Sequence, residues 1–307
     1  VYGVWEPIAG AVGLNKLVGL KNIPLLQERI SRLAFTMTKA EAGLNLPEKV
    51  YDIYEVEMTS EQTKAYLDLK TKLAIEFEDI STGEMGVMEA NHVLTALLRL
   101  AQITSGFVTT SAIEDEEGGV VAPKKIHQIN PDKNPKIEAV VELLTEEDRD
   151  VFSKTIIWAC FREDIKTISK VLKEKGIKHA TYFGDTSTDE RDRIVRDFNN
   201  DDSLRVIVCN PQTAGEGLNL LGYNPTDPDK SRCYTGHEIF FSQNWSGLLR
   251  SQAEDRAHRR GTRMPVRITD LVVAGTIDEE IRKRVTAKIE IANSVTDLRE
   301  TMANILK

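Results

Sequence analysis

The chain has 307 residues, enough to bury a sizeable core and to form two domains. Hydrophobic residues make up 41% and charged residues 29%, which is typical of a globular protein, and no apolar stretch is long enough to span a bilayer. We therefore expect no membrane partner. The net charge of -8 does not exclude nucleic acid, because a local basic strip is sufficient to neutralise phosphates.

The start of the chain and its cysteines indicate a protein of a reducing compartment. Val1 is followed by no basic stretch of the kind that opens a signal peptide, so we expect a processed or truncated start. Cys160, Cys209 and Cys233 lie far apart, and Cys160 and Cys209 end apolar runs, so we expect these two to be buried free thiols. Cys233 and His237 have the spacing of half a metal site, but without a second pair we expect no metal here.

The first part of the chain predicts helices around one strand. The elements expected are a helical segment over 1–47, a strand at 49–58, and helices at about 59–78 and 88–103. Residues 111–133 contain an acidic run, two adjacent glycines and prolines, which favour a linker. We therefore divide the chain into a helical segment (1–47), a strand with a helical protrusion (48–110), a linker (111–133) and a second domain (134–307).

After the linker, strands and helices alternate. The strands expected are 155–160, 179–183, 205–209, 238–241 and 267–273, and the helices are 163–175, 188–199, 248–260 and 276–291. The run 155–160 is continuously apolar, as expected for a strand buried on both faces. This order predicts an α/β fold, a parallel sheet with helices on both faces.

Ligands of such sheets bind outside the carboxyl ends of the strands. Gly215 and Gly217, in the loop 210–220 that follows the third of these strands, would let backbone amides approach a phosphate, although a tight turn needs glycine as well. The chain has no phosphate loop ending in Gly-Lys-Ser/Thr, no Ser-His-Asp elbow and no HExxH motif. We therefore do not expect a self-contained hydrolase.

The basic stretch 252–260 suggests an anion site. Gln252, Arg256 and Arg259 would share one face of a helix, and two guanidiniums one turn apart suit a planar anion with several oxygens. The alternative is a surface helix with local ion pairs. Residues 249–267 contain six arginines and only two acidic residues, Glu254 and Asp255, so the local net charge is +4.

Several ordered blocks resemble one family. Residues 252–259 read Gln-Ala-Glu-Asp-Arg-Ala-His-Arg, residues 210–220 end in Gly-Glu-Gly-Leu-Asn-Leu, and residues 275–279 read Gly-Thr-Ile-Asp-Glu. With the blocks at 154–161, 183–187, 46–49 and 98–103, they resemble the second, RecA-like ATPase lobe of SWI/SNF-type DNA translocases of helicase superfamily two. The resemblance covers about residues 32 to 292. It implies a RecA-like lobe preceded by a helical protrusion.

The resemblance also implies roles for single residues. Arg256 and Arg259 would be arginine fingers, with Gln252, Gly215, Gly217 and Asn219 on the nucleotide side. Residues expected on a double-stranded DNA track are Phe161, Arg162, Gly184, Thr186, Thr213 and Trp245. ATP with Mg2+ would be held mainly by an N-terminal ATPase lobe that this sequence lacks, so we expect the chain alone to be an inactive monomer.

Departures from the family pattern leave alternatives. Asn210-Pro211 stands for the usual Ser-Thr, Ala214 for a glycine and Asn244 for an aspartate, and the stretch between strands at 221–237 is longer. We expect a divergent bacterial or viral member, cytoplasmic in the cell or the infected cell, and nuclear if eukaryotic. The second hypothesis is a degenerate lobe that docks DNA or protein without catalysis. A nucleotide-sugar transferase also pairs two α/β lobes, but nothing here carries its donor site.

Overall fold

A computed structural model describes most of the chain. The described residues are 3–7, 15–22, 24–25, 28–29, 39, 42–82, 90–110, 113–114, 120–122, 125–146, 153–214, 217–223 and 233–289. Gly215, part of the predicted nucleotide side, and the turn-rich stretch 224–229 lie outside them.

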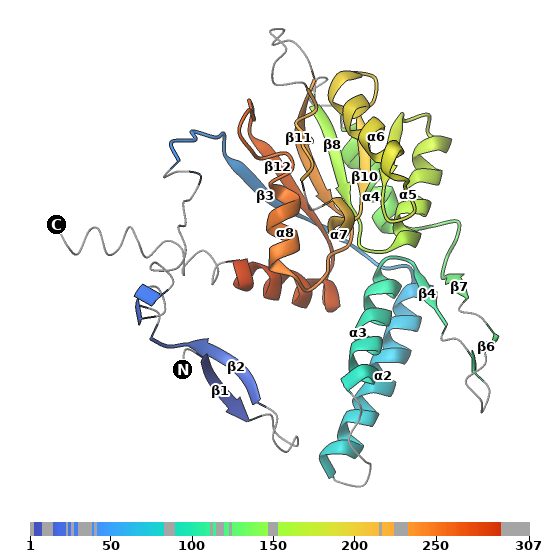
Figure 1. Cartoon of the computed structure of the whole chain (residues 1–307). Coiled ribbons are helices and arrows are strands. Elements are labelled where there is room, and N and C mark those ends of the chain that lie inside the picture. The colour runs from blue at the N-terminus through green and yellow to red at the C-terminus, as the bar shows by residue number, and fades with distance from the viewer. Residues whose placement is uncertain are drawn as a thin grey trace.

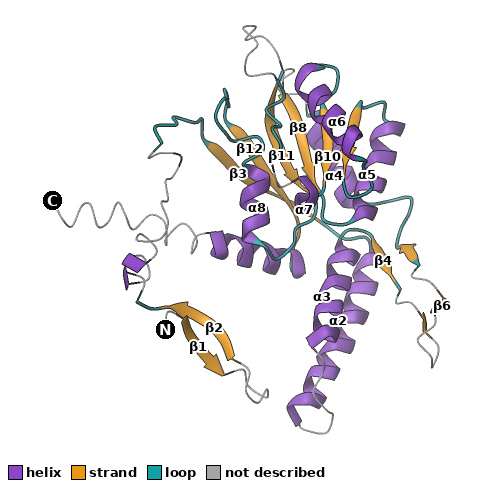
Figure 2. Ribbon diagram, in the orientation of Figure 1, coloured by secondary structure: helices purple, strands orange, loops and turns teal. Residues whose placement is uncertain are grey.

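A six-stranded sheet in which all pairings are parallel forms the centre of the described chain, in the order β3-β12-β11-β8-β10-β9 (Figures 1 and 2). The strands are β3 (Lys49–Val56), β8 (Ser153–Trp158), β9 (His179–Tyr182), β10 (Val206–Cys209), β11 (Tyr234–Phe240) and β12 (Val266–Val273). The predicted α/β class and RecA-like strand arrangement are confirmed.

Helices cover both faces of this sheet, as predicted. They are α4 (Pro135–Thr145), α5 (Arg162–Glu174), α6 (Thr188–Asn200), the short α7 (Pro211–Ala214) and α8 (Gly247–Glu254). One hydrophobic cluster joins the sheet to α4 and α5, and a second joins the opposite face to α6 and α8. All six residues of β8 are buried, which explains the continuous apolar run in the sequence.

Strand β3 is an edge strand of this sheet and was not placed there by the sequence. All eight of its residues pair in parallel with β12. Arg267 on β12 bridges to Asp52 on β3 at 2.8 Å and to Glu146 at 2.9 Å, just beyond α4. The two segments are separated by more than 200 residues, so only the tertiary structure brings them together.

The helical protrusion consists of α2 (Ser60–Thr82) and α3 (Ala90–Thr104), which extend from the carboxyl edge of the sheet (Figure 1). Their bases pack with the helical residues 277–289 in a third hydrophobic cluster that includes Tyr66, Leu100 and Ile281. Gly106 follows α3 with φ +97°, and a Cβ there would lie 2.4 Å from Asn134, the N-cap of α4. A glycine is therefore required where the protrusion meets the sheet.

Two expectations need correction. The segment 1–47 was expected to be helical, but its described part contains an antiparallel pair, β1 (Gly3–Pro7) and β2 (Asn15–Leu20). The predicted linker is also partly strand: β4 (Phe107–Thr109) pairs with β7 (Ile126–Gln128), and β5 (Ile113–Glu114) pairs with β6 (Val120–Ala122). In both segments short antiparallel strands within about 20 residues of each other pair their backbones, and helical periodicity does not reveal this.

Arg250 on α8 is a buried centre of ion pairs. Its Nε donates to Glu254 at 2.7 Å, its Nη1 donates to Gln243 at 2.8 Å, and it forms an ion pair with Asp270 on β12. Burial alone would lower the pKa of Arg250, but the charges of Asp270 and Glu254 raise it above its ordinary value. The helix is thereby tied to the sheet beneath it.

A second buried network fixes the protrusion. Lys136 Nζ donates to Asp278 at 2.7 Å and to the Phe241 carbonyl at 3.2 Å, and the Thr104 hydroxyl donates to Asp278 at 2.8 Å. The Lys136 side chain is 2% exposed and that of Asp278 is 10% exposed. This pair therefore joins α4, the end of α3 and helix 277–289.

We expect Lys136→Met to lower the free energy of unfolding by about 3 kcal/mol, because it leaves a buried carboxylate without its cation. Urea unfolding of the chain measures this. The matched control Lys170→Met, in an exposed pair with Glu174, should change stability by less than about 0.5 kcal/mol. A Lys136→Met effect as small as that of the control would contradict the assignment.

Glu238 predicts a dependence of stability on pH. It is fully buried on β11, accepts a hydrogen bond from Trp158 Nε1 at 2.6 Å, and burial raises its pKa to about 8. The folded protein therefore holds this proton more tightly than the unfolded chain, and the stabilisation is lost as pH rises toward and through 8.

We expect the free energy of unfolding of Glu238→Gln, relative to that of the wild type, to rise by about 1 kcal/mol between pH 7 and pH 9, because the amide does not ionise. Urea unfolding of both proteins at the two pH values measures the difference. If the difference between them is the same at both values, Glu238 does not titrate in this range.

Candidate functional site

The guanidinium groups of Arg256 and Arg259 converge on one backbone carbonyl. Arg256 Nη1 donates to the Leu218 carbonyl at 3.1 Å and Arg259 Nη1 donates to it at 2.8 Å. Arg256 Nε also donates to the Gln252 carbonyl at 2.8 Å. The structure thus brings the two predicted arginines together, and it places Gln252 beside the first of them.

These arginines do not lie on one continuous helix, as the sequence suggested. Helix α8 ends at Glu254, and residues 255–260 form turns and bends. Arg256 N bonds to the Ala253 carbonyl, three residues back, whereas His258 N bonds to Glu254, four residues back. The Thr262 hydroxyl donates a hydrogen bond to the Ala257 carbonyl at 2.7 Å. A side chain thus bonds to a backbone carbonyl that a longer helix would use internally. The spacing of the residues in the sequence does not predict this early end of the helix.

The six arginines of this stretch have different environments. Arg250 and Arg267 pair with carboxylates, and Arg263 stacks over the Tyr223 ring at 3.9 Å. Within the described residues, Arg256 and Arg259 have no carboxylate within ion-pair distance. Burial and the charge of Arg259 lower the pKa of Arg256. Two half-buried cations beside a single carbonyl are an arrangement that an anion would stabilise.

The loop between β10 and β11 connects the carboxyl edge of the sheet to these arginines. Asn210 Nδ2 donates to the carbonyls of Ala159 and Cys160, at the end of β8. Farther along, the Leu220 amide donates to the Arg256 carbonyl at 3.2 Å. The loop therefore reaches from one predicted region of the site to the other.

The predicted nucleotide-side residues of this loop differ in environment. Gly217 is exposed with φ +73°, a conformation that favours glycine, and no atom lies within 4 Å of the position a Cβ would take. The Asn219 carbonyl accepts from Asn199 at 2.7 Å, which ties the loop to α6, while Asn219 Oδ1 is buried without a partner among the described residues. Sequence reasoning missed the Leu218 carbonyl, because a backbone acceptor has no sequence signal.

The predicted nucleic-acid residues all lie at the carboxyl edge of the sheet, away from the arginine pair. They follow successive strands: Phe161 and Arg162 after β8, Gly184 and Thr186 after β9, Thr213 in α7 after β10, and Trp245 after β11. Helix α8 begins at this edge and runs back along the face of the sheet (Figure 2). The structure thus separates the candidate site into two regions, which the sequence did not distinguish.

Arg162 and Gly184 form the most exposed part of this edge. Arg162 pairs with Asp185 at 2.8 Å, and a Cβ on Gly184 would lie 3.1 Å from the Arg162 guanidinium. Glycine at 184 therefore leaves room for the arginine. Thr186 is buried, and its hydroxyl accepts from the Phe183 amide at 3.2 Å, so its side chain closes the loop.

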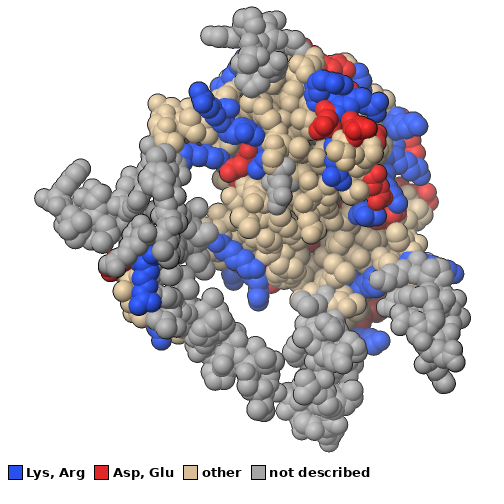
Figure 3. All heavy atoms as spheres, viewed as in Figure 1, with Lys and Arg blue, Asp and Glu red and all other residues tan. Residues whose placement is uncertain are grey.

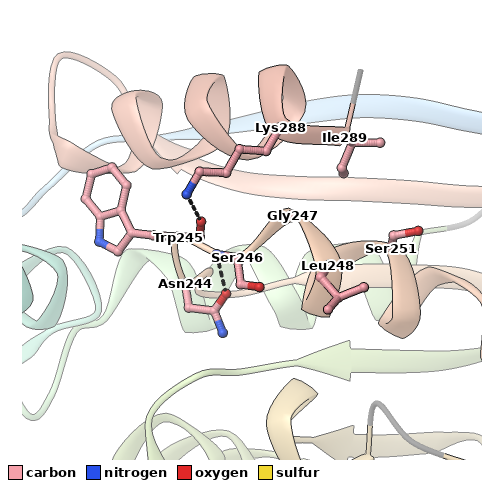
Figure 4. Close-up of a pocket in the computed structure, with 8 residues that line it drawn as sticks. All are labelled: Asn244, Trp245, Ser246, Gly247, Leu248, Ser251, Lys288 and Ile289. Atoms are coloured by element: carbon pink, nitrogen blue, oxygen red, sulfur yellow. Dashed lines mark hydrogen bonds between the residues drawn. The ribbon is translucent and has the colours of Figure 1, made fainter. Parts of the chain in front are cut away.

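The two aromatic residues at this edge pack toward the protrusion. Phe161 meets Phe107 edge to face at 5.6 Å, and both Phe161 and Trp245 adjoin the third hydrophobic cluster. The Trp245 carbonyl accepts from Lys288 at 2.6 Å (Figure 4). Trp245 and Lys288 line a pocket of about 640 Å³ beside the start of α8. The rings of Phe161 and Trp245 therefore pack against the third hydrophobic cluster as well as lying at the carboxyl edge of the sheet.

A buried carboxyl group that the sequence did not single out joins these loops. Asp164 accepts from the Ser242 hydroxyl at 2.6 Å and from Ser105 at 3.5 Å, and Ser242 in turn accepts from the Cys160 amide. Burial raises the pKa of Asp164 to about 7. Asp164 lies three residues after Phe161 in an ordinary helix start, so no sequence signal distinguished it.

Positive and negative side chains are mixed over one part of the visible face. Figure 3 shows Lys and Arg interspersed with Asp and Glu over α5 and α6.

Among the described residues, no group of three or more His, Cys, Asp or Glu side chains could hold a metal ion. In the same part of the chain no helix has the length and apolar character needed to cross a membrane.

Comparison with known proteins finds similarity to helicase C-terminal domains. A profile of the helicase conserved C-terminal domain matches residues 135–225. A probable global transactivator of Orgyia pseudotsugata multicapsid polyhedrosis virus is 24% identical over 303 residues, covering 96% of this chain and 55% of the viral protein. The chain spans about half of that relative, and smaller shares of other curated relatives.

Solved structures show the same fold. The C-terminal part of the Fun30 ATPase domain superposes with a TM-score of 0.60 at 18% identity, covering 78% of this chain and 90% of that one. The Sulfolobus solfataricus SWI2/SNF2 ATPase core in complex with dsDNA gives a TM-score of 0.56 at 24% identity, covering 87% of this chain and 50% of that one. Residues 135–225 thus resemble a helicase conserved C-terminal domain, and the predicted resemblance of the chain to the C-terminal lobe of SWI/SNF-type helicases is confirmed.

Proposed function

We propose that this chain is the C-terminal half of an ATP-dependent translocase on double-stranded DNA, and that Arg256 and Arg259 are its arginine fingers. The observation that carries the proposal is the convergence of both guanidiniums on the Leu218 carbonyl. A backbone carbonyl bears only a partial negative charge, so a phosphate placed nearby would compete for these donors.

The residues around the arginine pair fit a nucleotide phosphate. The described residues provide donors from two arginines and an exposed Gly217 with no atom near the position that a Cβ would take. ATP with Mg2+ would supply the phosphoryl group, and a first ATPase lobe would hold most of it. Arg256 and Arg259 would neutralise negative charge on the transferred group.

The carboxyl edge fits the backbone of a duplex. Arg162 is exposed beside Gly184, and the edge has loops from four neighbouring strands. Contacts to phosphates position a protein without reading sequence, as motion along DNA requires. A solved relative in fold, the Sulfolobus SWI2/SNF2 core, is described in complex with dsDNA, which supports this assignment.

The loop 210–220 gives a physical connection between the two regions. Asn210 contacts the carboxyl edge, and Leu218 contacts both arginines. Movement of this loop would therefore change the arginine environment and the edge together. We assign the coupling of ATP hydrolysis to DNA movement to it, with Gly215, Gly217 and Asn219 as predicted from the sequence.

The alternative is a lobe that docks DNA or protein without catalysis. Asn210 supports this alternative. Its side-chain amide donates to the carbonyls of Ala159 and Cys160, whereas the Ser-Thr pair that is usual in the family would offer a hydroxyl contact to DNA. The arginine pair opposes it, because a docking module has no need for two cations held without carboxylates.

In a protein that carries both lobes, we expect Arg256→Ala and Arg259→Ala each to lower the kcat of ATP hydrolysis by about 10³-fold or more, as for comparable fingers. ATP binding should change much less, because the arginines act on charge that develops in the transition state. Steady-state hydrolysis and nucleotide titration measure the two effects.

Arg260→Ala is the matched control, since Arg260 is an exposed arginine next to the pair. It should hydrolyse ATP at close to the wild-type rate. Loss of ATP binding in step with kcat would show that Arg256 and Arg259 are ground-state contacts instead.

We expect the chain alone to bind duplex DNA weakly, and Arg162→Gln to reduce the slope of log K against log salt by about 1, because one phosphate contact is lost. Fluorescence anisotropy over a salt series measures this. Arg193→Gln, an exposed arginine paired with Glu190 on α6, should leave the slope unchanged. Tight binding with a steep slope would favour the docking module.

A further inference from the structure

The segment that leads into the sheet contacts the arginine turn at several points. We call residue 39 and residues 42–51 the strap, and residues 254–260 the arginine turn. Contacts from the strap reach Glu254 and Asp255, which precede Arg256, and His258, which lies between the two arginines. The strap is more than 200 residues away in sequence.

Two strap residues hold the beginning of the turn. Lys49 Nζ lies 2.8 Å from Glu254 and 3.5 Å from Asp255, and the Tyr51 hydroxyl donates to Glu254 at 2.8 Å. The Glu254 side chain is 5% exposed, and although burial would raise its pKa, the charges of Arg250 and Lys49 lower it. The last residue of α8 is therefore fixed as a carboxylate between α8 and β3.

Two further contacts hold the middle of the turn. Lys39 Nζ lies 2.5 Å from Asp255 and donates to the His258 carbonyl at 2.8 Å. His258 Nε2 lies 2.7 Å from the Pro47 carbonyl, which only accepts, so this nitrogen carries the proton. Lys39 thus binds the Asp255 side chain, just before Arg256, and the His258 backbone carbonyl, just after it.

These contacts compensate for the early end of the helix. A continuous helix would fix Arg256 and Arg259 by its own backbone ladder, but α8 ends at Glu254. The direction of the two side chains then depends on what holds residues 255–258 from outside. Lys39 takes the His258 carbonyl, a group that a longer helix would use internally.

We propose that Lys39 and Lys49 are positioning residues for the arginine fingers, and that the strap links the path of the chain into this lobe to the placement of Arg256 and Arg259. This rests on the proposed function of the two arginines. A change in the position of the strap would move the turn through Asp255 and His258. The arginines would then approach or leave the Leu218 carbonyl. Because Lys49 and Tyr51 belong to β3, a shift at that end of the strap would also involve the edge of the sheet.

The first test concerns the turn itself and needs no nucleotide. In Lys39→Met and Lys49→Met, hydrogen exchange of the backbone amides at 255–260 should become about threefold to fivefold faster, as the loss of a partly exposed ion pair predicts. Lys178→Met is the matched control, because Lys178 pairs with Asp201 at 2.7 Å beside edge strand β9. It should leave these amides unchanged. Unchanged exchange in both strap variants would overturn the proposal.

The second test concerns catalysis in a protein with both lobes. Lys49→Met should lower the kcat of ATP hydrolysis severalfold with the KM for ATP within about twofold, and Lys49→Arg, which keeps the charge, should restore most of the rate. Because loss of the ion pair with buried Glu254 also destabilises the fold, circular dichroism of each variant at the assay temperature must show the same folded fraction as the wild type. Wild-type kcat in both Lys39→Met and Lys49→Met would also overturn the proposal.

The two proposals fail separately. If Arg256→Ala and Arg259→Ala keep the wild-type kcat, the arginines are not fingers, whatever the strap variants do. If the arginine variants lose activity and the strap variants change neither exchange nor kcat, the proposed function stands and the positioning role falls.

Discussion

The buried guanidinium of Arg250 determines how the surrounding elements meet. It reaches Glu254 on its own helix, Gln243 after β11 and Asp270 on β12, and it stacks over the Phe240 ring at 3.5 Å. A buried cation is costly unless its donors are satisfied, so these partners must remain together for the lobe to fold. The position of α8 on the sheet follows from that constraint, and the end of α8 in turn places the arginine turn.

The position of α8 separates the two proposed functional regions of the lobe. The helix begins at the carboxyl edge, beside Trp245, and ends near the arginine pair, so the predicted DNA track and the predicted nucleotide side lie at different parts of the sheet. The loop that contains Leu218 reaches both. A sheet with a loop that contacts both regions would suit the proposed coupling between nucleotide and DNA, because few elements would need to move.

The protrusion is joined to the same edge through buried polar groups. Asp164 receives hydroxyl donors from Ser242 and Ser105, and Lys136 joins Asp278 where Thr104 also donates. Unpaired groups of this kind are costly in the interior, so α2 and α3 are held in one orientation relative to the sheet. Aromatic residues expected to face DNA contribute to this packing, with Phe161 against Phe107.

The sequence alone determined the alternating strands and helices of the second part of the chain, because buried strands such as 155–158 need continuous apolar residues and helices need their own period. It also drew attention to Arg256 and Arg259, although their spacing left a surface helix open and only the family resemblance implied a role for them. Only the tertiary structure decided that β3 joins the sheet, that α8 ends at Glu254, and that the Leu218 carbonyl receives both arginines. These features depend on contacts across more than 35 residues, or on backbone acceptors that every residue has, and neither leaves a local pattern.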